Sequence, residues 1–197
     1  MRTAPQHRPE SSCVEQCPLR RRRRRRPQNQ LNSHHFPLTM GGKAKSYIRE
    51  GEPHLKPFIV VRGADKALEF YQKALGAEEL HRLRSPTGKV VHGAIRIQGC
   101  LLMIAEEDAE NGFKSPELLG GSAGGFAVYY EDCDAAFKRA VEAGANVVHE
   151  VHDHFHGERC GTIQDPFGHQ WAITTLIEDL TPEEVQKKID DMMAPPS

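Results

Sequence analysis

The side chains best suited to chemistry near neutral pH lie in an apolar stretch around His92. His92 and Arg96 stand four residues apart in the stretch 90–97, and strand alternation would place both on one face. There His92 could accept or donate a proton while Arg96 neutralises an anionic ligand. We therefore take His92 as the candidate catalytic residue. The alternative is structural, with Arg96 paired to a carboxylate and His92 making one hydrogen bond.

A second group of histidines follows in the C-terminal half, at His149, His152, His154 and His156. If the chain stays extended there, the last three side chains point the same way and could bind zinc, nickel or copper. The alternative is a solvated polar rim.

The five cysteines predict neither a disulfide framework nor a nucleophile. Their number is odd and their spacing does not repeat, which favours a reducing compartment. Cys100 and Cys160 have no neighbouring base in the sequence to activate the thiol. A metal site made of Cys13, Cys17 and His7 would bring only three ligands in a polar segment, and we disfavour it.

Residues 1–50 are expected to be disordered, because they are polar, rich in Pro and Arg, and lack apolar periodicity. Residues 1–39 hold nine of the 26 basic residues but two of the 27 acidic ones. The run Arg20 to Arg26 could bind nucleic acid or another polyanion, direct the chain to the nucleus, or belong to an organellar transit peptide. Alternatively, it is a dispensable extension before a second start at Met40.

The rest of the chain is mildly acidic, so nucleic acid is not expected as its main partner. No apolar stretch is long enough to span a bilayer. We therefore expect a soluble, cytoplasmic protein with no membrane partner, and the nucleus or an organelle only through the N-terminal extension.

The chain repeats one pattern at a spacing of 68 residues. Gly76-Ala77 recurs as Gly144-Ala145, and Gly93-Ala94-Ile95 recurs as Gly161-Thr162-Ile163. Each copy reads as a strand, a helix and three more strands, so we expect one domain built from two copies of a module. The turn-rich segment 107–122 joins them.

Periodicity and turn residues predict the bounds of the elements. The first copy has strands 58–61, 78–84, 89–97 and 100–106 and a helix 64–75; the second has strands 126–130, 145–151, 159–164 and 169–175 and a helix 133–143. A last helix, 181–193, begins with the capping box Thr181-Pro182-Glu183-Glu184. Its apolar face, Val185, Ile189 and Met192, could dock on the domain or on a second subunit.

Three segments carry a family resemblance: residues 155–161 (FHGERCG), residues 165–171 (DPFGHQW) and residues 91–97 (VHGAIRI). The chain resembles the glyoxalase/bleomycin-resistance superfamily, also called vicinal-oxygen-chelate (VOC), and within it the PhnB-like branch, from about Pro53 to Thr175. The resemblance implies an α+β domain over residues 53–176, in which two βαβββ modules form a half-open eight-stranded barrel. It also implies a homodimer. Within the motif we read Asp165 as a turn-former and Trp171 as packed under a helix.

Enzymes of that superfamily hold a metal with four His or Glu side chains. The resemblance places these positions on Lys56, Ile104 (or Met103), Gly124 or Gly125, and Ala172. None of these side chains suits a divalent ion, so no metal cofactor is expected. Two alternatives for Zn, Ni or Fe remain: His54, which shares a strand face with Lys56, and the cluster His152, His154 and His156.

Strand alternation from those four positions predicts which side chains face the barrel cavity. They are Phe58, Val60, His92, Ala94, Arg96, Leu102 and Ile104 from the first module, and Ala127, Tyr129, Gln170, Ala172 and Thr174 from the second. This is a mostly apolar lining with a few polar groups, as in small-molecule sites. At the cavity mouth, His156 and Arg159 are weaker candidates for holding an anion.

The sequence thus predicts a VOC domain without the usual metal, binding a small, partly apolar or anionic molecule. The predicted ligand-binding residues are Phe58, His92, Arg96, Tyr129, Phe155, His156, Arg159 and Gln170. One alternative is a metal-dependent enzyme of the glyoxalase I type, a lactoylglutathione-lyase-like or other VOC lyase, isomerase or dioxygenase. The other is polyanion binding through Arg20 to Arg26.

Overall fold

Each half of the chain folds as a strand, a helix and three further strands, as the repeat predicts. The computed structural model describes residue 44 and residues 46–194, and Ile48–Ser197 form one unit by themselves. The run Arg20 to Arg26, Cys13, Cys17 and nearly all of the segment predicted to be disordered lie outside the described residues.

The element bounds agree with the predicted ones to within two residues, apart from the short helix α2 in the linker, which was not predicted. The first module comprises β1 (Phe58–Val61), α1 (Ala64–Leu75), β2 (Glu78–Arg84), β3 (Val90–Ile97) and β4 (Cys100–Glu106), followed by α2 (Pro116–Leu119). The second comprises β5 (Gly125–Tyr129), α3 (Cys133–Glu142), β6 (Asn146–Asp153), β7 (Glu158–Gln164) and β8 (Gln170–Leu176), followed by α4 (Pro182–Met193).

Each module forms its own four-stranded mixed sheet, and the two sheets have the same topology. The strand orders are β1-β4-β3-β2 and β5-β8-β7-β6. In each sheet the first strand runs parallel to the last, and the other neighbours are antiparallel. The α+β class and the two βαβββ modules are therefore confirmed.

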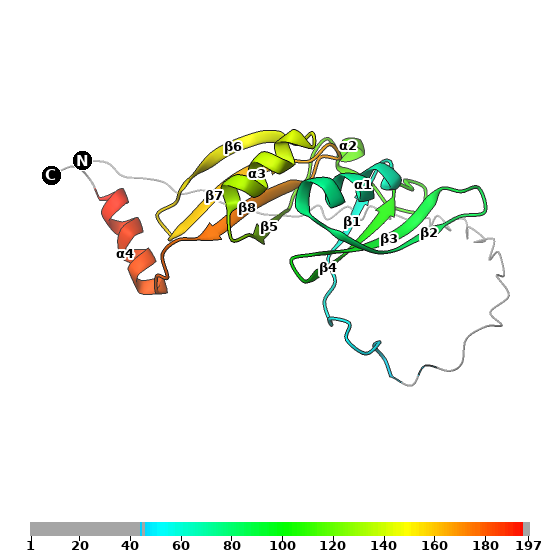
Figure 1. The fold of residues 1–197 in the computed structure, drawn as a ribbon, viewed down its shortest axis with the longest axis horizontal. Coiled ribbons are helices and arrows are strands. Elements are labelled where there is room, and N and C mark those ends of the chain that lie inside the picture. Colours follow the sequence, from blue (N-terminus) through cyan, green and yellow to red (C-terminus); the bar gives the residue numbers. More distant parts are fainter. Residues whose placement is uncertain (1–43, 45, 195–197) are drawn as a thin grey trace, which may run out of the picture. The chain divides into compact units, whose positions relative to one another are not determined.

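Helices α1 and α3 lie on the same side of the two sheets and pack against each other (Figure 1). Gly93 on β3 and Gly161 on β7 face these helices. A Cβ atom at Gly93 would lie 3.1 Å from the Leu68 side chain, and one at Gly161 would lie 2.6 Å from Phe137. Their strand neighbours, including His92 and Cys160, therefore point the other way. We call the side of the sheets turned away from α1 and α3 the cavity face.

The buried carboxylate of Asp165 connects the two modules. Tyr71 on α1 and Trp171 on β8 both donate to its Oδ2, at 2.7 and 2.8 Å. The backbone N–H groups of Phe167 and His169 donate to Oδ1, each at 2.9 Å. Four donors satisfy a carboxylate that is only 1% exposed. Asp165 is thus a structural turn residue, and Trp171 is packed in the core, as both were interpreted from the sequence.

The last helix, α4, has the predicted capping box but no buried side chain. Val185 and Ile189 are half-buried and Met192 is exposed, so little of the predicted apolar face is covered within the described part of the chain.

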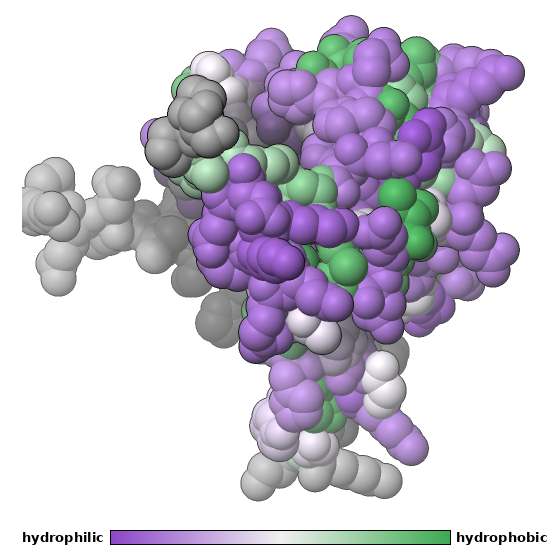
Figure 2. Space-filling view, turned by 90° about the vertical axis from the view of Figure 1, so that its left-hand side faces the viewer, coloured by the Kyte–Doolittle hydropathy of each residue, from purple (hydrophilic) through white to green (hydrophobic). Residues whose placement is uncertain are grey.

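The face seen in Figure 2 is mainly hydrophilic, with apolar side chains in small patches. None of the helices that the structure describes has the length and apolar character needed to cross a membrane.

Candidate functional site

Two rows of register-paired residues cross the cavity face of the first module. Paired residues on neighbouring strands share a face of the sheet. One row contains Phe58, Met103, Ala94 and His81, and the next contains Val60, Ala105, His92 and Leu83. The strand pairing therefore brings two histidines, from β2 and β3, onto adjacent rows.

The rings of His81 and His92 lie nearly parallel and meet edge to edge, with one nitrogen of each facing the other. His81 Nε2 lies 3.3 Å from His92 Nδ1, and the ring centroids are 5.4 Å apart with an interplanar angle of 14°. In the neutral pair one of these nitrogens donates its hydrogen to the other, and the tautomers of the two rings decide which one is the donor.

A cavity of about 390 Å³ opens around this pair. It is lined by the apolar side chains Leu80, Leu83, Ala94, Leu101 and Met103 and by the polar ones Arg49, Glu52, Lys56, His81 and His92. A cavity of about 630 Å³ shares His92 and includes Phe58. A third, of about 460 Å³, shares Leu101 and reaches Tyr129 in the second module. The cavity face is thus hollowed around His92 and toward the boundary between the modules.

The first cavity has a surplus of positive charge. Glu52 accepts from Lys56 at 2.5 Å and lies 3.7 Å from Arg49, so one carboxylate faces two cations. Burial, and then the neighbouring His81 and Lys56, lower the pKa of His92. His92 is therefore mainly neutral at pH 7 and can act as a proton acceptor.

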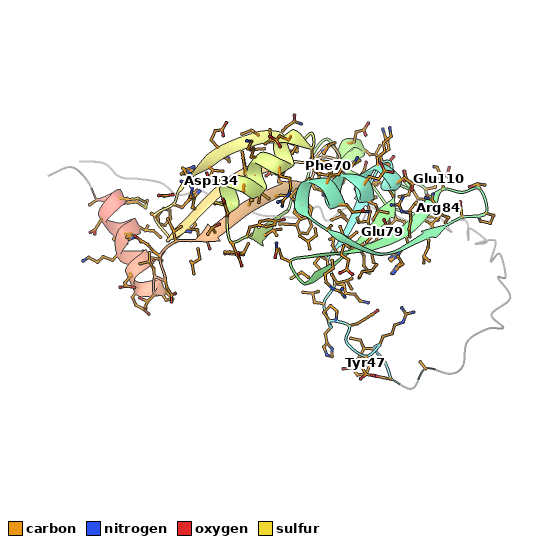
Figure 3. The ribbon with its side chains drawn as sticks, in the orientation of Figure 1. Tyr47, Phe70, Glu79, Arg84, Glu110 and Asp134 are labelled. Atoms are coloured by element: carbon orange, nitrogen blue, oxygen red, sulfur yellow. The ribbon has the colours of Figure 1, made fainter. Side chains whose placement is uncertain are left out.

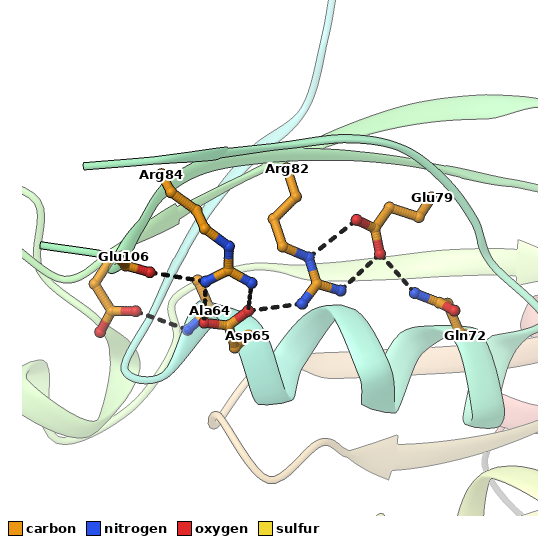
Figure 4. A network of polar contacts seen from close by, with 8 residues as sticks. Ala64, Asp65, Gln72, Glu79, Arg82, Arg84 and Glu106 are labelled. Carbon is orange, nitrogen blue, oxygen red and sulfur yellow. Dashed lines mark hydrogen bonds and ion pairs between the residues drawn. The ribbon is translucent and has the colours of Figure 1, made fainter. Parts of the chain in front are cut away.

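An ionic network on the helix side of β2 holds that strand against α1. Arg82 binds Asp65 at 2.6 Å and Glu79 at 2.7 Å, and Arg84 binds the same Asp65 at 2.7 Å (Figure 4). Figure 3 shows Glu79 and Arg84 beside α1. The pairing register shifts between Glu79 and His81, which is a β-bulge. Because of it, Glu79 joins the network while His81 faces the cavity.

His81 is the site residue that the sequence analysis missed. Strict alternation puts Glu79 and His81 on one face, and no glycine or proline in β2 marks the bulge. The available signal was a lone histidine in a strand whose other polar residues are all charged.

The prediction that Leu102 and Ile104 face the cavity is wrong. Both pack on the helix side, with exposed fractions of 5% and 0%. The parallel pairing of β1 with β4 sets Met103 beside Phe58, so Leu101, Met103 and Ala105 take the cavity face. The predicted metal-ligand position on Ile104 therefore moves to its stated alternative, Met103.

Arg96 lies on the same face as His92, but its guanidinium is engaged elsewhere. It forms an ion pair of 3.1 Å with Glu78 on β2. It does not line the cavity around His92, so the structure shows the structural alternative for this arginine. Phe58 is on the predicted face, half exposed, and contacts Phe113 edge-on with ring centroids 5.9 Å apart.

The cavity face of the second module also carries register-paired rows: one contains Tyr129, Thr174, Cys160 and His152, and the next contains Ala127, Ala172, Thr162 and His149. Tyr129 donates to Glu158 at 2.5 Å, which raises the pKa of its hydroxyl. Thr174 donates to the sulfur of Cys160 at 3.3 Å. The strand register thus places His152 beside Cys160, although the two residues are eight positions apart in the sequence. Gln170 is exposed on the same face, in the row of Gly125.

Of the predicted histidine cluster, His149 and His152 lie on β6, and His154 and His156 lie in the turn between β6 and β7. The ring centroids of His152 and His154 are 4.0 Å apart, and those of His154 and His156 are 5.0 Å apart. His156 lies 3.6 Å from Glu158. Burial, and then its two neighbours, lower the pKa of His154. Lone pairs lie in the ring planes, so rings packed face against face with interplanar angles of 34° and 25° do not converge on one ion. In the described part of the chain no three His, Cys, Asp or Glu side chains are grouped to hold a metal.

The other predicted rim residues have separate positions. Arg159 points to the helix side, where it binds Asp134 on α3 and Asp153 on β6, both at 2.7 Å. These carboxylates raise the pKa of Arg159 and occupy its guanidinium. Its expected anion-binding role at the mouth therefore has no geometric support. Phe155 is 38% exposed in the turn beside His156, and His54 is exposed before β1.

The four positions expected to hold a metal in enzymes of the VOC type do not fit one. They carry the Lys56 ammonium, the Met103 thioether and the side chains of Gly125 and Ala172, which have no donor atom. Among the residues that the structure describes, Glu52 is the one carboxylate that lines the cavity around His92, and two cations already share it.

Comparison with known proteins agrees with this fold. Residues 53–173 match the family model of the glyoxalase/bleomycin resistance protein/dioxygenase superfamily. The Mycobacterium bovis protein Mb0911c is 40% identical over 138 residues, which cover 68% of this chain and 91% of that protein. The Arabidopsis thaliana gene product At5g48480 shares the fold with a TM-score of 0.52 and 27% identity, covering 61% of this chain and 97% of that one. TioX from Micromonospora sp. ML1 also shares the fold, with a TM-score of 0.50 and 23% identity, covering 64% of this chain and 99% of that one. The chain therefore belongs to the glyoxalase/bleomycin resistance protein/dioxygenase superfamily.

Proposed function

We propose that this chain binds a small, partly apolar molecule on the cavity face of its first module, with His81 and His92 meeting the polar group of the ligand. The observation that carries the proposal is the 3.3 Å contact between the two imidazoles inside a cavity whose other walls are mainly aliphatic. Small-molecule sites combine apolar walls with a few polar groups that fix the orientation of the ligand.

His92 is the candidate acid or base of this site. Its lowered pKa favours the neutral imidazole at pH 7, which is the form that accepts a proton. His81 holds the ring by the contact between His81 Nε2 and His92 Nδ1. The geometry of the pair gives more support to ligand binding than to proton transfer to or from a bound molecule.

A metal-dependent lyase, isomerase or dioxygenase of the glyoxalase I type has less support. The side chains at the four expected positions offer an ammonium, a thioether and no other donor. The PhnB-like branch, a homodimer and a cytoplasmic location remain further proposals. Polyanion binding through Arg20 to Arg26 is a separate one, and it predicts affinity that falls steeply with salt and disappears on truncation to Met40.

Mass spectrometry of small molecules that co-purify with the protein tests the proposed function. Met103→Trp and Leu101→Trp each fill the cavity, while Met192→Trp on the exposed helix α4 is the matched control. We expect a compound that is retained by the unchanged protein and the control and is lost from both cavity variants. Equal retention by all four proteins, with unchanged thermal unfolding, contradicts a site in this cavity.

A further inference from the structure

Each ring of the histidine pair keeps one nitrogen that is not used within the pair. His81 Nε2 and His92 Nδ1 face each other, which leaves His81 Nδ1 and His92 Nε2. Among the residues that the structure describes, none forms a hydrogen bond with either of these outer nitrogens. Both residues line the same cavity of about 390 Å³, so the outer nitrogens are available to a ligand there, beside the polar groups of Arg49, Glu52 and Lys56.

The number of protons on the pair determines what it offers. With two neutral rings, one inner N–H donates to the other ring, and the outer nitrogens present one donor and one acceptor in either direction of that bond. One additional proton makes both outer nitrogens donors while the inner hydrogen bond is kept. A carboxylate has two acceptor oxygens, so it matches the protonated pair and not the neutral one.

The charges around the pair also favour an anion. The segment before β1 lines the cavity with Arg49, Glu52 and Lys56, three residues that together carry one positive charge in excess, while Glu50 of the same segment lies outside this cavity. Lys89 and Asp108 line the adjoining cavity that shares His92, together with Glu106 and Glu107.

The acids of the adjoining cavity keep their negative charge, but each is held by a donor that lies outside the cavity around the pair. Glu106 accepts from the backbone N–H groups of Gly63 and Ala64 at 2.9 and 2.7 Å, and Glu107 pairs with Arg62 at 2.9 Å. Asp108 accepts from Asn111 at 2.7 Å. On β4, the residues facing the pair are uncharged, and Arg96 on β3 is paired with Glu78.

We propose that the ligand of this cavity is a small apolar carboxylate, and that its binding is coupled to uptake of one proton by the His81–His92 pair. The inference rests on the proposed function and names the class of molecule that the site takes. The aliphatic walls contact the apolar body of the ligand, and the two outer N–H groups hold the carboxylate.

Proton uptake gives the binding a defined pH dependence. Burial and neighbouring charges lower the pKa of His92 in the free protein, and a bound anion raises it. Affinity for a carboxylate therefore weakens by up to about tenfold per pH unit between the pKa of the free pair and the raised pKa of the complex, and it levels off above the latter. A neutral isostere gains nothing from the extra proton, so its affinity does not follow this slope.

Benzoate and benzamide are suitable probes, because they have similar shape and benzoate stays ionised throughout the range of interest. Binding is followed by calorimetry from about pH 6 to 8.5, in buffers of different ionisation enthalpy. We expect benzoate binding to take up a proton and to weaken as pH rises, and benzamide binding to stay flat. His92→Gln and His81→Gln should each abolish the slope, and His152→Gln in the second module should keep it.

The outcomes separate the inference from the function on which it rests. If both probes bind without proton uptake, or if their affinities change equally with pH, the carboxylate inference is overturned and a small-molecule site is left in place. A slope for benzoate that survives in both His81→Gln and His92→Gln also overturns it. If neither probe binds and neither perturbs the Met103 methyl signal at millimolar concentration, both proposals fail.

Discussion

The hydroxyl of Tyr71 on α1 donates a hydrogen bond of 2.7 Å to Oδ2 of Asp165, a residue 94 positions later in the other module. Burial and the Asp165 charge raise the pKa of Tyr71, so the phenol stays protonated and remains a donor. The turn that contains Asp165 is thereby tied to the helix of the first module. This contact contributes to the joint core in which α1, α3 and both sheets meet.

Tyr71→Phe removes one of the four donors to this carboxylate. We expect it to lower the free energy of unfolding by about 1–3 kcal/mol, because a buried charge loses a hydrogen bond. Tyr130→Phe is the matched control, since that hydroxyl is only half-buried and donates to a neutral carbonyl, Leu75 O, at 2.8 Å. Urea denaturation measures the free energy of unfolding of both variants. An equal or larger loss in Tyr130→Phe would argue against the role given to Asp165.

The two glycines of the repeat face the two helices at different distances. A Cβ at Gly161 would lie 2.6 Å from Phe137 and 2.7 Å from Val151, whereas one at Gly93 would lie 3.1 Å from Leu68. Gly161→Ala should therefore destabilise the fold by about 1–3 kcal/mol through overpacking, and Gly93→Ala by less. Thermal unfolding of both variants tests this order, and the reverse order would contradict the packing described for α3.

Two histidines should titrate below the ordinary range. Burial is the first cause of the lowered pKa in both His92 and His154, followed by neighbouring positive groups. The unfolded chain then binds more protons than the folded one, so these residues make the protein less stable as pH falls below the unfolded value of about 6.5. NMR titration of the imidazole signals checks the direction. Midpoints at or above those of a histidine peptide would disprove it.

The sequence predicted the elements well because local patterns encode them. Gly76 ends α1 with φ of 66°, and Asp132 caps α3, accepting from Ala135 N–H at 2.9 Å; glycine and aspartate are residue types that favour these positions. The spacing of 68 residues places Gly93 and Gly161 at equivalent positions under the two helices. Such signals depend on nearby residues alone, so they can be read without tertiary information.

The candidate site was harder to predict because strand pairing decides it. Leu102 and Ile104 were placed on the wrong face because the reference position on β4 was off by one residue, and a shift by one reverses every side chain. His81 was missed because a bulge follows Glu79. Arg96 was placed on the correct face, but its partner Glu78 comes from β2 and only the register brings the two together.

Methionine provides the most direct test of the central claim that a small molecule binds beside His81 and His92. Of the methionines that the structure describes, Met103 lines this cavity, whereas Met192 and Met193 are exposed on α4. With ¹³C-labelled methionine methyl groups, a panel of small apolar carboxylates and their amides can be screened by NMR. We predict that the Met103 signal shifts in a saturable manner while those of Met192 and Met193 stay unchanged. No shift at Met103 across the panel, or equal shifts at all three, would contradict the proposed site.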